Sequence, residues 1–294
     1  MSASEGRFPK KPAWLKVKFP SHAQYFFVDR LLREKRLHTI CRSARCPNTG
    51  ECWSEKTATF LILGDVCTRS CSFCAVNKGR PSADPDGEAL RVAEAAEAMN
   101  LDYCVVTSVT RDDLPDGGAS VFADVIRALR CTRPDIRVEV LVPDFAGNPE
   151  ALQIVLDATP DVLNHNLEVP ENIYPAIGRP AANYRRSLDL VAEAGRKGAT
   201  TKSGLMVGLG EDLNDLTRTI RDLRRAGCKL LTIGQYLQPE RGNVPVARFY
   251  PPTEFEGIKA EALGLGFQAV EAGPLVRSSY RARRMFSSTA ERGD

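Results

Sequence analysis

The chain has 294 residues, of which 43% are hydrophobic, and a formal net charge of +3. This length can bury a substantial core and is typical of a single α/β barrel, so we do not expect the chain to divide into two halves. A net charge this small does not favour a protein that binds nucleic acid. The sequence has no signal-peptide hydrophobic region and no apolar run of 18 residues, so we expect a cytoplasmic protein with no membrane contact.

Strand and helix patterns alternate along most of the chain. Residues 1 to about 20 predict an extended arm, and the segment that follows has helical spacing, with Phe27, Leu31 and Leu32 on one stripe. The pattern then predicts six strands, at residues 59–63, 103–107, 136–142, 162–166, 201–207 and 230–236. Between the strands it predicts five helices, at residues 88–99, 121–130, 151–158, 184–197 and 213–226. Two further segments close the chain, at residues 255–263 and 268–271.

Such repeats of strand and helix imply a parallel sheet with right-handed crossovers. We therefore expect an α/β fold built as a six-stranded partial barrel that is open on one side. Polar residues follow several of the predicted strands, and the carboxyl ends of the strands are where barrels of this kind build their sites.

Three cysteines just after the first predicted strand form one prominent motif. Cys67, Cys71 and Cys74 are spaced C-x3-C-x2-C in a loop. Three thiolates can hold three irons of a [4Fe–4S] cube, and the fourth iron then stays open for a small molecule. Two alternatives are a zinc site, which usually needs four ligands in paired arms, and unconnected buried cysteines.

A second trio of cysteines stands shortly before the first. Cys41, Cys46 and Cys52 are spaced C-x4-C-x5-C, with Pro47 and Asn48 marking a turn between them. Three cysteines this close together, and this close to another trio, argue against unrelated residues of the hydrophobic core. One joint site is possible, but each trio has its own tight loop, so two separate clusters fit better.

In this setting the later trio resembles the cluster loop of the radical S-adenosylmethionine (SAM) superfamily, in which the open iron binds SAM. The two trios together, over a likeness that runs from about residue 7 to 285, resemble lipoyl synthase more specifically. That family carries an Arg-Ser-Ser-Tyr motif near the C-terminus, which stands here at residues 277–280. The resemblance implies two [4Fe–4S] clusters, with Cys67, Cys71 and Cys74 holding the catalytic one and Cys41, Cys46, Cys52 and Ser279 holding an auxiliary one.

The resemblance also implies how the chain is divided. Residues 56–250 are expected to form a radical-SAM-type partial (β/α)6 TIM barrel. An N-terminal extension, residues 1–55, carries the auxiliary cysteines, and a C-terminal extension, residues 251–294, carries the Arg-Ser-Ser-Tyr motif.

The same likeness places SAM-binding residues at the strand ends. Thr107 and Ser108 are candidates for the amino group and Glu168 for the ribose hydroxyls, while residues 204–211 match a G-x-I-x-G-x-x-E signature that supports the adenine. Lys202 and Arg69 are candidates for the carboxylate. The full set of expected cofactor contacts is Phe73, Thr107, Ser108, Asn166, Glu168, Lys202, Gly204, Met206, Gly208 and Glu211.

The activity implied by the resemblance is the insertion of two sulfur atoms, at carbons 6 and 8, into an octanoyl chain that an amide bond attaches to a lysine. SAM at the first cluster yields a 5′-deoxyadenosyl radical that removes hydrogen, and the auxiliary cluster supplies the sulfur. The expected partners are octanoylated carrier domains (dehydrogenase E2 subunits or the glycine-cleavage H protein), a low-potential donor such as ferredoxin or flavodoxin, and an iron–sulfur carrier protein.

Two other classes remain as alternatives. A methylthiotransferase would need a differently spaced second trio and usually an RNA-binding module, and neither is visible. A non-enzymatic iron–sulfur or zinc protein would have no use for an open iron. Iron and sulfide content separates these classes.

Several residues outside the motifs carry smaller expectations. Asn243 stands where the family pattern predicts a histidine, which leaves its role open, and His165 is expected to be a satisfied core residue. Cys104, Cys131 and Cys228 are expected to be buried packing residues. Basic residues gather near both ends and form either solvated termini or a docking face for an acidic partner: Arg7, Lys10, Lys11, Lys16 and Lys18 at the start, and Arg277, Arg281, Arg283 and Arg284 at the finish.

Overall fold

An eight-stranded sheet with helices along its outer face makes up most of the chain. The structure is a computed structural model, and it describes residues 10–17, 22–82 and 87–290. The strands lie in the order β1-β2-β5-β6-β7-β8-β9-β10. Their bounds are β1 His38–Thr39, β2 Thr59–Ile62, β5 Tyr103–Ser108, β6 Arg137–Leu141, β7 Val162–Asn164, β8 Thr201–Val207, β9 Leu230–Gln235 and β10 Ala269–Gly273. A separate short pair consists of β3 Val66–Cys67 and β4 Asn77–Lys78.

The six strands predicted from the sequence are the central strands β2 and β5 to β9, and all their neighbouring pairs are parallel. The sheet extends beyond them on both edges. At one edge β10 pairs parallel with β9, and at the other β1 pairs antiparallel with β2. The expected α/β partial barrel is therefore confirmed, with one more strand at each edge than the repeat pattern assigned.

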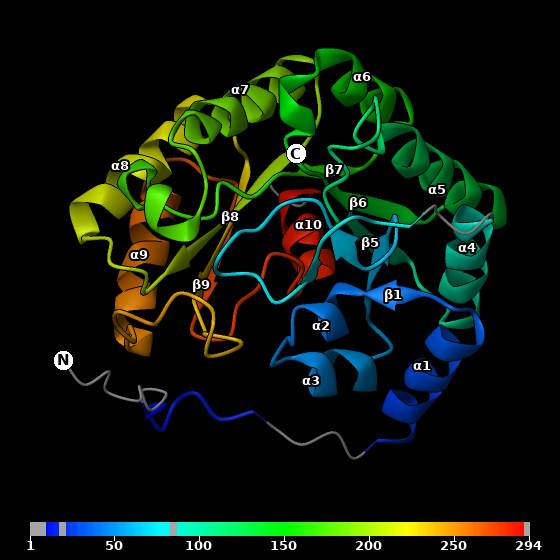
Figure 1. The fold of residues 1–294 in the computed structure, drawn as a ribbon, viewed down its shortest axis with the longest axis horizontal. Coiled ribbons are helices and arrows are strands. Elements are labelled where there is room, and N and C mark those ends of the chain that lie inside the picture. The colour runs from blue at the N-terminus through cyan, green and yellow to red at the C-terminus, as the bar shows by residue number, and fades with distance from the viewer. Residues whose placement is uncertain (1–9, 18–21, 83–86, 291–294) are drawn as a thin grey trace.

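Six helices follow the strands and form an arc around the sheet (Figure 1). Each buries one stripe of apolar side chains against the strands, as alternation of strand and helix requires. Within the described ranges, none of the helices has the length and apolar character needed to cross a bilayer. The six are α4 Glu88–Ala98, α5 Ala119–Thr132, α6 Pro149–Asp157, α7 Ala182–Arg196, α8 Leu213–Arg225 and α9 Pro252–Gly264.

Three helices precede the first parallel strand. The predicted early helix is α1, Ala23–Glu34. It buries Leu31 and Leu32 of the expected stripe together with Val28, whereas Phe27 is half-buried. The short helices α2, Ile40–Ser43, and α3, Thr49–Ser54, carry cysteines of the second trio and were not predicted. In Figure 1 these two helices lie in the middle of the molecule beneath the opening of the arc, and α1 lies beside α4.

The last helix, α10, Ala282–Ala290, lies inside the arc of helices (Figure 1). Its buried Met285 packs against the first residues of three strands, Val162, Leu230 and Ala269. Ala282 packs in the same way against the start of β5. The C-terminal helix therefore closes the amino ends of the strands, and the opposite ends stay available for a site.

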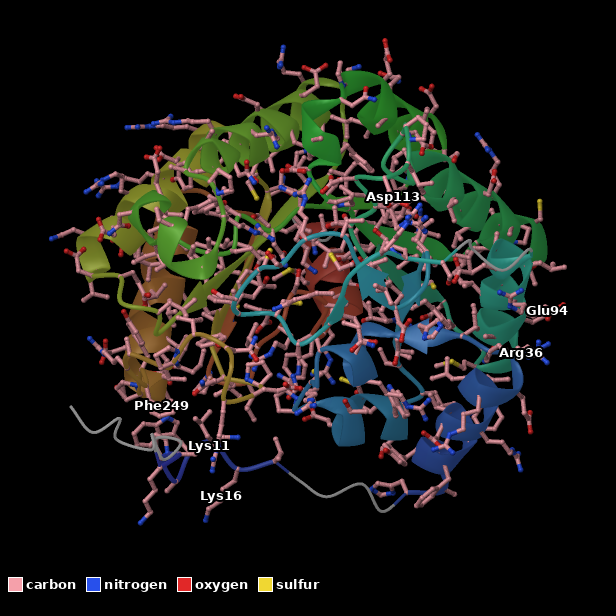
Figure 2. All side chains as sticks on the ribbon, viewed as in Figure 1. Lys11, Lys16, Arg36, Glu94, Asp113 and Phe249 are labelled. Carbon is pink, nitrogen blue, oxygen red and sulfur yellow. The ribbon has the colours of Figure 1, made fainter. Side chains whose placement is uncertain are left out.

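The basic residues near the two ends of the chain lie in different surroundings where the structure describes them. Lys10, Lys11 and Lys16 are exposed, and Figure 2 shows Lys11 and Lys16 on the N-terminal segment, at the periphery. Arg7 and Lys18 lie outside the described residues. At the other end, Arg283 pairs with Asp102.

Candidate functional site

The loop with Cys67, Cys71 and Cys74 connects β3 to β4 and crosses in front of the strand ends (Figure 1). Other segments hold it through backbone hydrogen bonds. The amide of Thr68 donates to the carbonyl of Thr110 at 3.0 Å. On the far side, the Ser72 amide donates to the carbonyl of Ile177, which ends the short 3-10 turn η3, Pro175–Ile177. The loop is therefore fixed by segments that follow β5 and β7.

Arg179 approaches this loop from the turn that follows η3, and the sequence reading did not single it out. Its Nε donates to Cys71 Sγ at 3.2 Å, and its guanidinium lies 5.4 Å from the ring centre of Phe73. On the other side it lies 3.8 Å from a carboxylate oxygen of Glu168. A cation beside a cysteine sulfur favours the thiolate, which is the form that binds metal.

Asn243, whose role the sequence left open, contacts the same loop. Its side-chain amide donates to the carbonyls of Ser72, at 2.8 Å, and of Cys74, at 3.1 Å. The next residue adds a third bond, because the Val244 amide also donates to the Ser72 carbonyl. The segment after β9 thus holds the part of the loop between the second and third cysteines.

Glu168 stands just beyond the end of β7 in a strained conformation. Its φ is +73°, in a region that residues other than glycine seldom adopt. Its amide and carbonyl both bond to β8, at Gly204 and Met206. Burial raises the pKa of its carboxyl group, while Arg179 and a hydrogen bond from Asn166 act in the opposite direction. Strain of this kind gathers at ligand sites, which supports Glu168 as a SAM contact.

The expected adenine signature forms the end of β8 and the turn after it. Glu211 folds back, so that its carboxylate accepts from the amides of Gly208, at 2.6 Å, and Leu209, at 2.9 Å. Gly208 has φ +98°, and a Cβ there would collide with Gln235 and with the backbone at Arg248. Only glycine fits this position. Met206 is half-buried beside it.

The two candidates at the end of β5 differ in what they already bind. The Thr107 hydroxyl donates to the Leu141 carbonyl at 2.9 Å. The Ser108 hydroxyl is buried, and no hydrogen-bond partner for it exists among the described residues. A buried hydroxyl without a partner is costly, so Ser108 is the better fit to a ligand.

The two candidates for the SAM carboxylate are both engaged elsewhere. Lys202 is fully buried, and its ammonium lies 2.8 and 3.1 Å from the carboxylate oxygens of Glu139. Arg69 forms two 2.7 Å bonds to Asp112 and one of 2.6 Å to Asp144. The geometry supports neither assignment, because each cation already has buried or bidentate anionic partners.

The second trio lies in a separate pocket with about 320 Å³ of empty space, part of which is open to solvent. Cys41, Cys46 and Cys52 line this pocket together with Ser279, although Ser279 is more than 220 residues further along the chain. The hydroxyl of Ser279 accepts a 2.8 Å hydrogen bond from Thr59, the first residue of β2. The structure therefore brings together the four residues that the family resemblance named as auxiliary-cluster ligands.

Burial dominates the chemistry of this pocket. It raises the pKa of Cys41 to about 11 and also raises that of Cys52 and Cys46. The guanidinium of Arg277 lies beside Cys46 and opposes that rise. Arg277 itself lines the pocket and is half-buried there. Without metal these thiols stay protonated near neutral pH, so metal binding must release protons.

The donor sets fit two iron–sulfur clusters better than zinc. In the part of the chain that the structure describes, no three histidine, cysteine or acidic side chains converge closely enough to share one metal ion. In a cube each protein ligand binds a different iron, so the ligands stand further apart than those of a single ion. β2 connects the two sites: Thr59 lines the auxiliary pocket, and Ile62 stands about 10 Å along the strand toward the radical-SAM loop.

The remaining cysteines divide into two kinds. Cys104 and Cys228 are buried, as predicted. The prediction for Cys131 was wrong, because this side chain is exposed near the end of α5. Helical spacing alone did not show which side of the last turn faces solvent.

The chain belongs to the radical SAM superfamily, the class of proteins that the cysteine loop and the open parallel sheet suggest. Residues 61–223, more than half of the chain, match the family model described as the radical SAM superfamily. Solved structures agree at the level of the fold. Streptococcus suis SuiB bound to its precursor peptide SuiA is 10% identical, with a TM-score of 0.55, covering 73% of this chain and 48% of that chain. HydG, a maturase of the [FeFe]-hydrogenase, is 15% identical, with a TM-score of 0.51, covering 79% and 62%.

Relatives identify the family within this class. Lipoyl synthase from Rubrobacter xylanophilus is 52% identical over 285 residues, which cover 96% of this chain and 88% of the relative. Lipoyl synthase from Chlorobium phaeovibrioides is 50% identical over 279 residues, covering 94% and 98%. This chain belongs to the lipoyl synthase family.

Proposed function

We propose that this chain inserts two sulfur atoms, at carbons 6 and 8, into an octanoyl group attached to a lysine of a carrier domain, and so forms the lipoyl group. The observation that carries the proposal is the pocket shared by Cys41, Cys46, Cys52 and Ser279. A radical-SAM enzyme needs only the loop trio to cleave SAM. A second donor set, in a pocket of its own, fits a reaction that also consumes sulfur.

With both clusters and SAM bound, the first cluster supplies a radical that removes hydrogen from unactivated carbon, and the second supplies sulfur. The protein's own part is to place these groups. Cys67, Cys71 and Cys74 hold the first cluster, and Arg179 and Asn243 fix their loop. Ser108, Asn166 and Glu168 are the best placed for the polar groups of SAM.

The adenine end of SAM would lie at the turn after β8. There Glu211 accepts from the backbone amides of Gly208 and Leu209, and Gly208 leaves room for Gln235 and the backbone at Arg248, so these contacts fix the shape of the turn against which a flat ring would lie. Gly204, Met206 and Phe73 complete the contacts that we propose on that side.

Ser279 is the proposed fourth ligand of the auxiliary cluster. A serine oxygen is a harder ligand than a thiolate and suits iron in a sulfide cluster less well. The iron that it holds should therefore leave first, which helps if this cluster is to be dismantled during the reaction.

The proposed division of the chain follows the two sites: residues 1–55 with the auxiliary cysteines, 56–250 as the barrel, and 251–294 with the Arg-Ser-Ser-Tyr motif. The proposed partners are octanoylated carrier domains of dehydrogenase E2 subunits or of the glycine-cleavage H protein. A low-potential donor such as ferredoxin or flavodoxin would supply electrons, and an iron–sulfur carrier protein would renew the auxiliary cluster.

The test is anaerobic incubation of the reconstituted protein with SAM, a reductant and an octanoyl-lysine peptide, followed by mass spectrometry. We expect a product with two added sulfur atoms, and about eight irons per chain from two cubes. Replacing Cys41, Cys46 and Cys52 by Ala should reduce the iron content to about four. Zinc without a visible chromophore would contradict the proposal.

Ser279→Ala provides a sharper test of the fourth ligand. We expect this variant to cleave SAM and to form no lipoyl product, because the loop cluster is intact and the auxiliary cluster is not. The matched control is Ser287→Ala, at an exposed position on α10. Wild-type product formation by the Ser279 variant would rule out a necessary role for this serine.

A further inference from the structure

Ser278, the residue before the proposed ligand, joins the two sites. It lies in the turn formed by residues 277–280, which is closed by a 2.9 Å hydrogen bond from the Tyr280 amide to the Arg277 carbonyl. Ser278 and Ser279 are the two central residues of this turn. Ser279 faces the cysteine pocket and Thr59, whereas Ser278 reaches the end of β7. A shift of one serine must therefore move the other.

The contacts of Ser278 form a directed series of hydrogen bonds. The Asn164 side-chain amide donates to the Ser278 hydroxyl at 2.9 Å, and that hydroxyl donates to the side-chain oxygen of Asn166 at 2.8 Å. Asn166 in turn acts on the carboxyl group of Glu168 and opposes the rise in its pKa that burial causes. The series starts beside the auxiliary pocket and ends at two residues proposed to contact SAM.

A buried charge fixes the direction of this series. The second hydrogen of the Asn164 amide donates to Glu139 at 2.9 Å. Glu139 is fully buried and also accepts from Lys202 and from the hydroxyl of Tyr103, so it can only be an acceptor here. Asn164 must therefore present its NH2 group to both Glu139 and Ser278, and the Ser278 hydrogen is left for Asn166.

Close packing keeps Asn166 in place. A Cβ at Gly204 would come within 2.6 Å of the Asn166 side-chain oxygen, so the absence of a side chain at this position makes room for it. The Ser278 hydroxyl donates to the same oxygen, so two contacts hold this end of the Asn166 side chain. The series of contacts thus has little freedom to rearrange.

We infer that Ser278 is a positioning residue that couples SAM binding at Asn166 and Glu168 to the placement of Ser279 in the auxiliary pocket. The inference rests on the proposed function and concerns how the two sites communicate. By linkage, such coupling acts equally in both directions, so a change at Ser279 must alter SAM affinity to the same extent that SAM alters the placement of Ser279.

The experiment is a double-mutant cycle with SAM affinity as its readout. The SAM dissociation constant is measured by anaerobic titration for the reconstituted wild type, Ser278→Ala, Ser279→Ala and the double variant. We expect Ser278→Ala to raise the constant by about two- to tenfold, the effect of losing one net hydrogen bond. Ser279→Ala should have no further effect in the Ser278→Ala background, because the link is already broken.

Two variants separate positioning from a general loss of structure. Ser278→Thr keeps the hydroxyl and should hold the dissociation constant within about twofold of wild type. Ser288→Ala removes a serine hydroxyl that donates to the Met285 carbonyl within α10, and it should behave as wild type. Iron content and thermal unfolding are recorded for each variant, so that a poorly folded protein is recognised.

The outcomes distinguish this inference from the proposed function. A wild type that binds no SAM, or holds far fewer than about eight irons, would overturn both. A wild type that does both, with Ser278→Ala binding SAM as tightly as wild type or with the two effects simply multiplying, would overturn the coupling alone.

Discussion

His165 directly follows β7, faces helix α7 and uses both of its ring nitrogens. Nδ1 lies 2.9 Å from the Val142 carbonyl, and Nε2 lies 2.9 Å from the Ser187 hydroxyl. A carbonyl only accepts, so Nδ1 carries the proton and Nε2 accepts from the serine. The expectation of a satisfied core histidine is confirmed, and the ring is held in its neutral form.

This arrangement predicts how stability depends on pH. Burial lowers the pKa of His165, against its ordinary value of about 6.5, so the unfolded chain binds the proton more readily. The contribution to stability is complete above pH 6.5. It falls by about 1.4 kcal/mol for each pH unit below that, until the lowered pKa is reached.

Denaturant unfolding of the metal-free protein between pH 5 and 7.5 measures this slope. His165→Gln should reduce the slope in that window, whereas His22→Gln, at an exposed position, should leave it unchanged. A slope that persists in the His165 variant would assign the effect to another group.

Asn243 provides a second test at the residue scale. Its NH2 group donates to two loop carbonyls from one nitrogen atom. The histidine expected from the family carries at most one N–H on each ring nitrogen, so no single atom of it can form both bonds. We expect Asn243→Ala to speed the chelator-driven loss of iron from the loop cluster by about two- to tenfold, with Asn243→His in between.

The measurement uses a background in which Cys41, Cys46 and Cys52 are Ala, so that only the loop cluster remains. Arg241→Ala, at an exposed position two residues away, is the control. Equal rates in the Ala variant and its parent would show that the two bonds do not hold the loop.

At the scale of elements, helix α8 begins with a strong capping residue just after the adenine-signature turn. The Asp212 side chain accepts from the Asp215 amide at 2.7 Å, and the extended backbone of Asp212 is typical of this position. The helix thus starts immediately after Glu211, whose carboxylate holds the turn, so the cap also fixes where that turn ends.

We expect Asp212→Ala to lower the free energy of unfolding by about 1 kcal/mol, the usual cost of losing an N-cap. Asp212→Ser should recover most of it, because a serine oxygen can cap the same amide. Denaturant unfolding measures both variants, and equal stability of the alanine and serine variants would exclude a capping role.

At the scale of the whole molecule, α10 joins the chain's end to strands from across the sheet. Met285 contacts residues that start β7, β9 and β10. The turn with Ser278 and Ser279 directly precedes this helix, so packing of α10 sets where both serines lie. The C-terminal segment therefore supports the site as well as the barrel.

Met285→Ala should lower the free energy of unfolding by about 2–5 kcal/mol, because it leaves a cavity at the closed end of the barrel. It should also reduce iron retention in the auxiliary pocket more than in the loop cluster. Arg284→Ala, at the exposed neighbour, should change stability by less than about 0.5 kcal/mol. A small effect of the Met285 variant would show that the sheet closes without this helix.

Sequence patterns predicted the central strands, the outer helices and both cysteine trios. These features depend on residues close together in the chain: a repeat of apolar positions, or cysteines a few residues apart. The grouping of Ser279 with Cys41, Cys46 and Cys52 came from family likeness, because spacing of this length carries no local signal. The edge strand β1 was not assigned, since its two residues are too few for a pattern, and the segment at 268–271, which overlaps β10, was not assigned to the sheet.

Tertiary structure alone decided which polar side chains are available for a ligand. The strand pattern placed both Lys202 and Ser108 near the expected SAM site. In the structure the charge of Lys202 is paired with Glu139, whereas the Ser108 hydroxyl has no hydrogen-bond partner among the described residues. Arg179 and Asn243 contact the loop with Cys67, Cys71 and Cys74, and Ser278 contacts the end of β7. All three lie in connecting segments that the fold of the sheet brings to these places. The sequence by itself determined the kinds of ligand atom present, whereas the long-range contacts between strand ends decided how these atoms are held, charged and oriented.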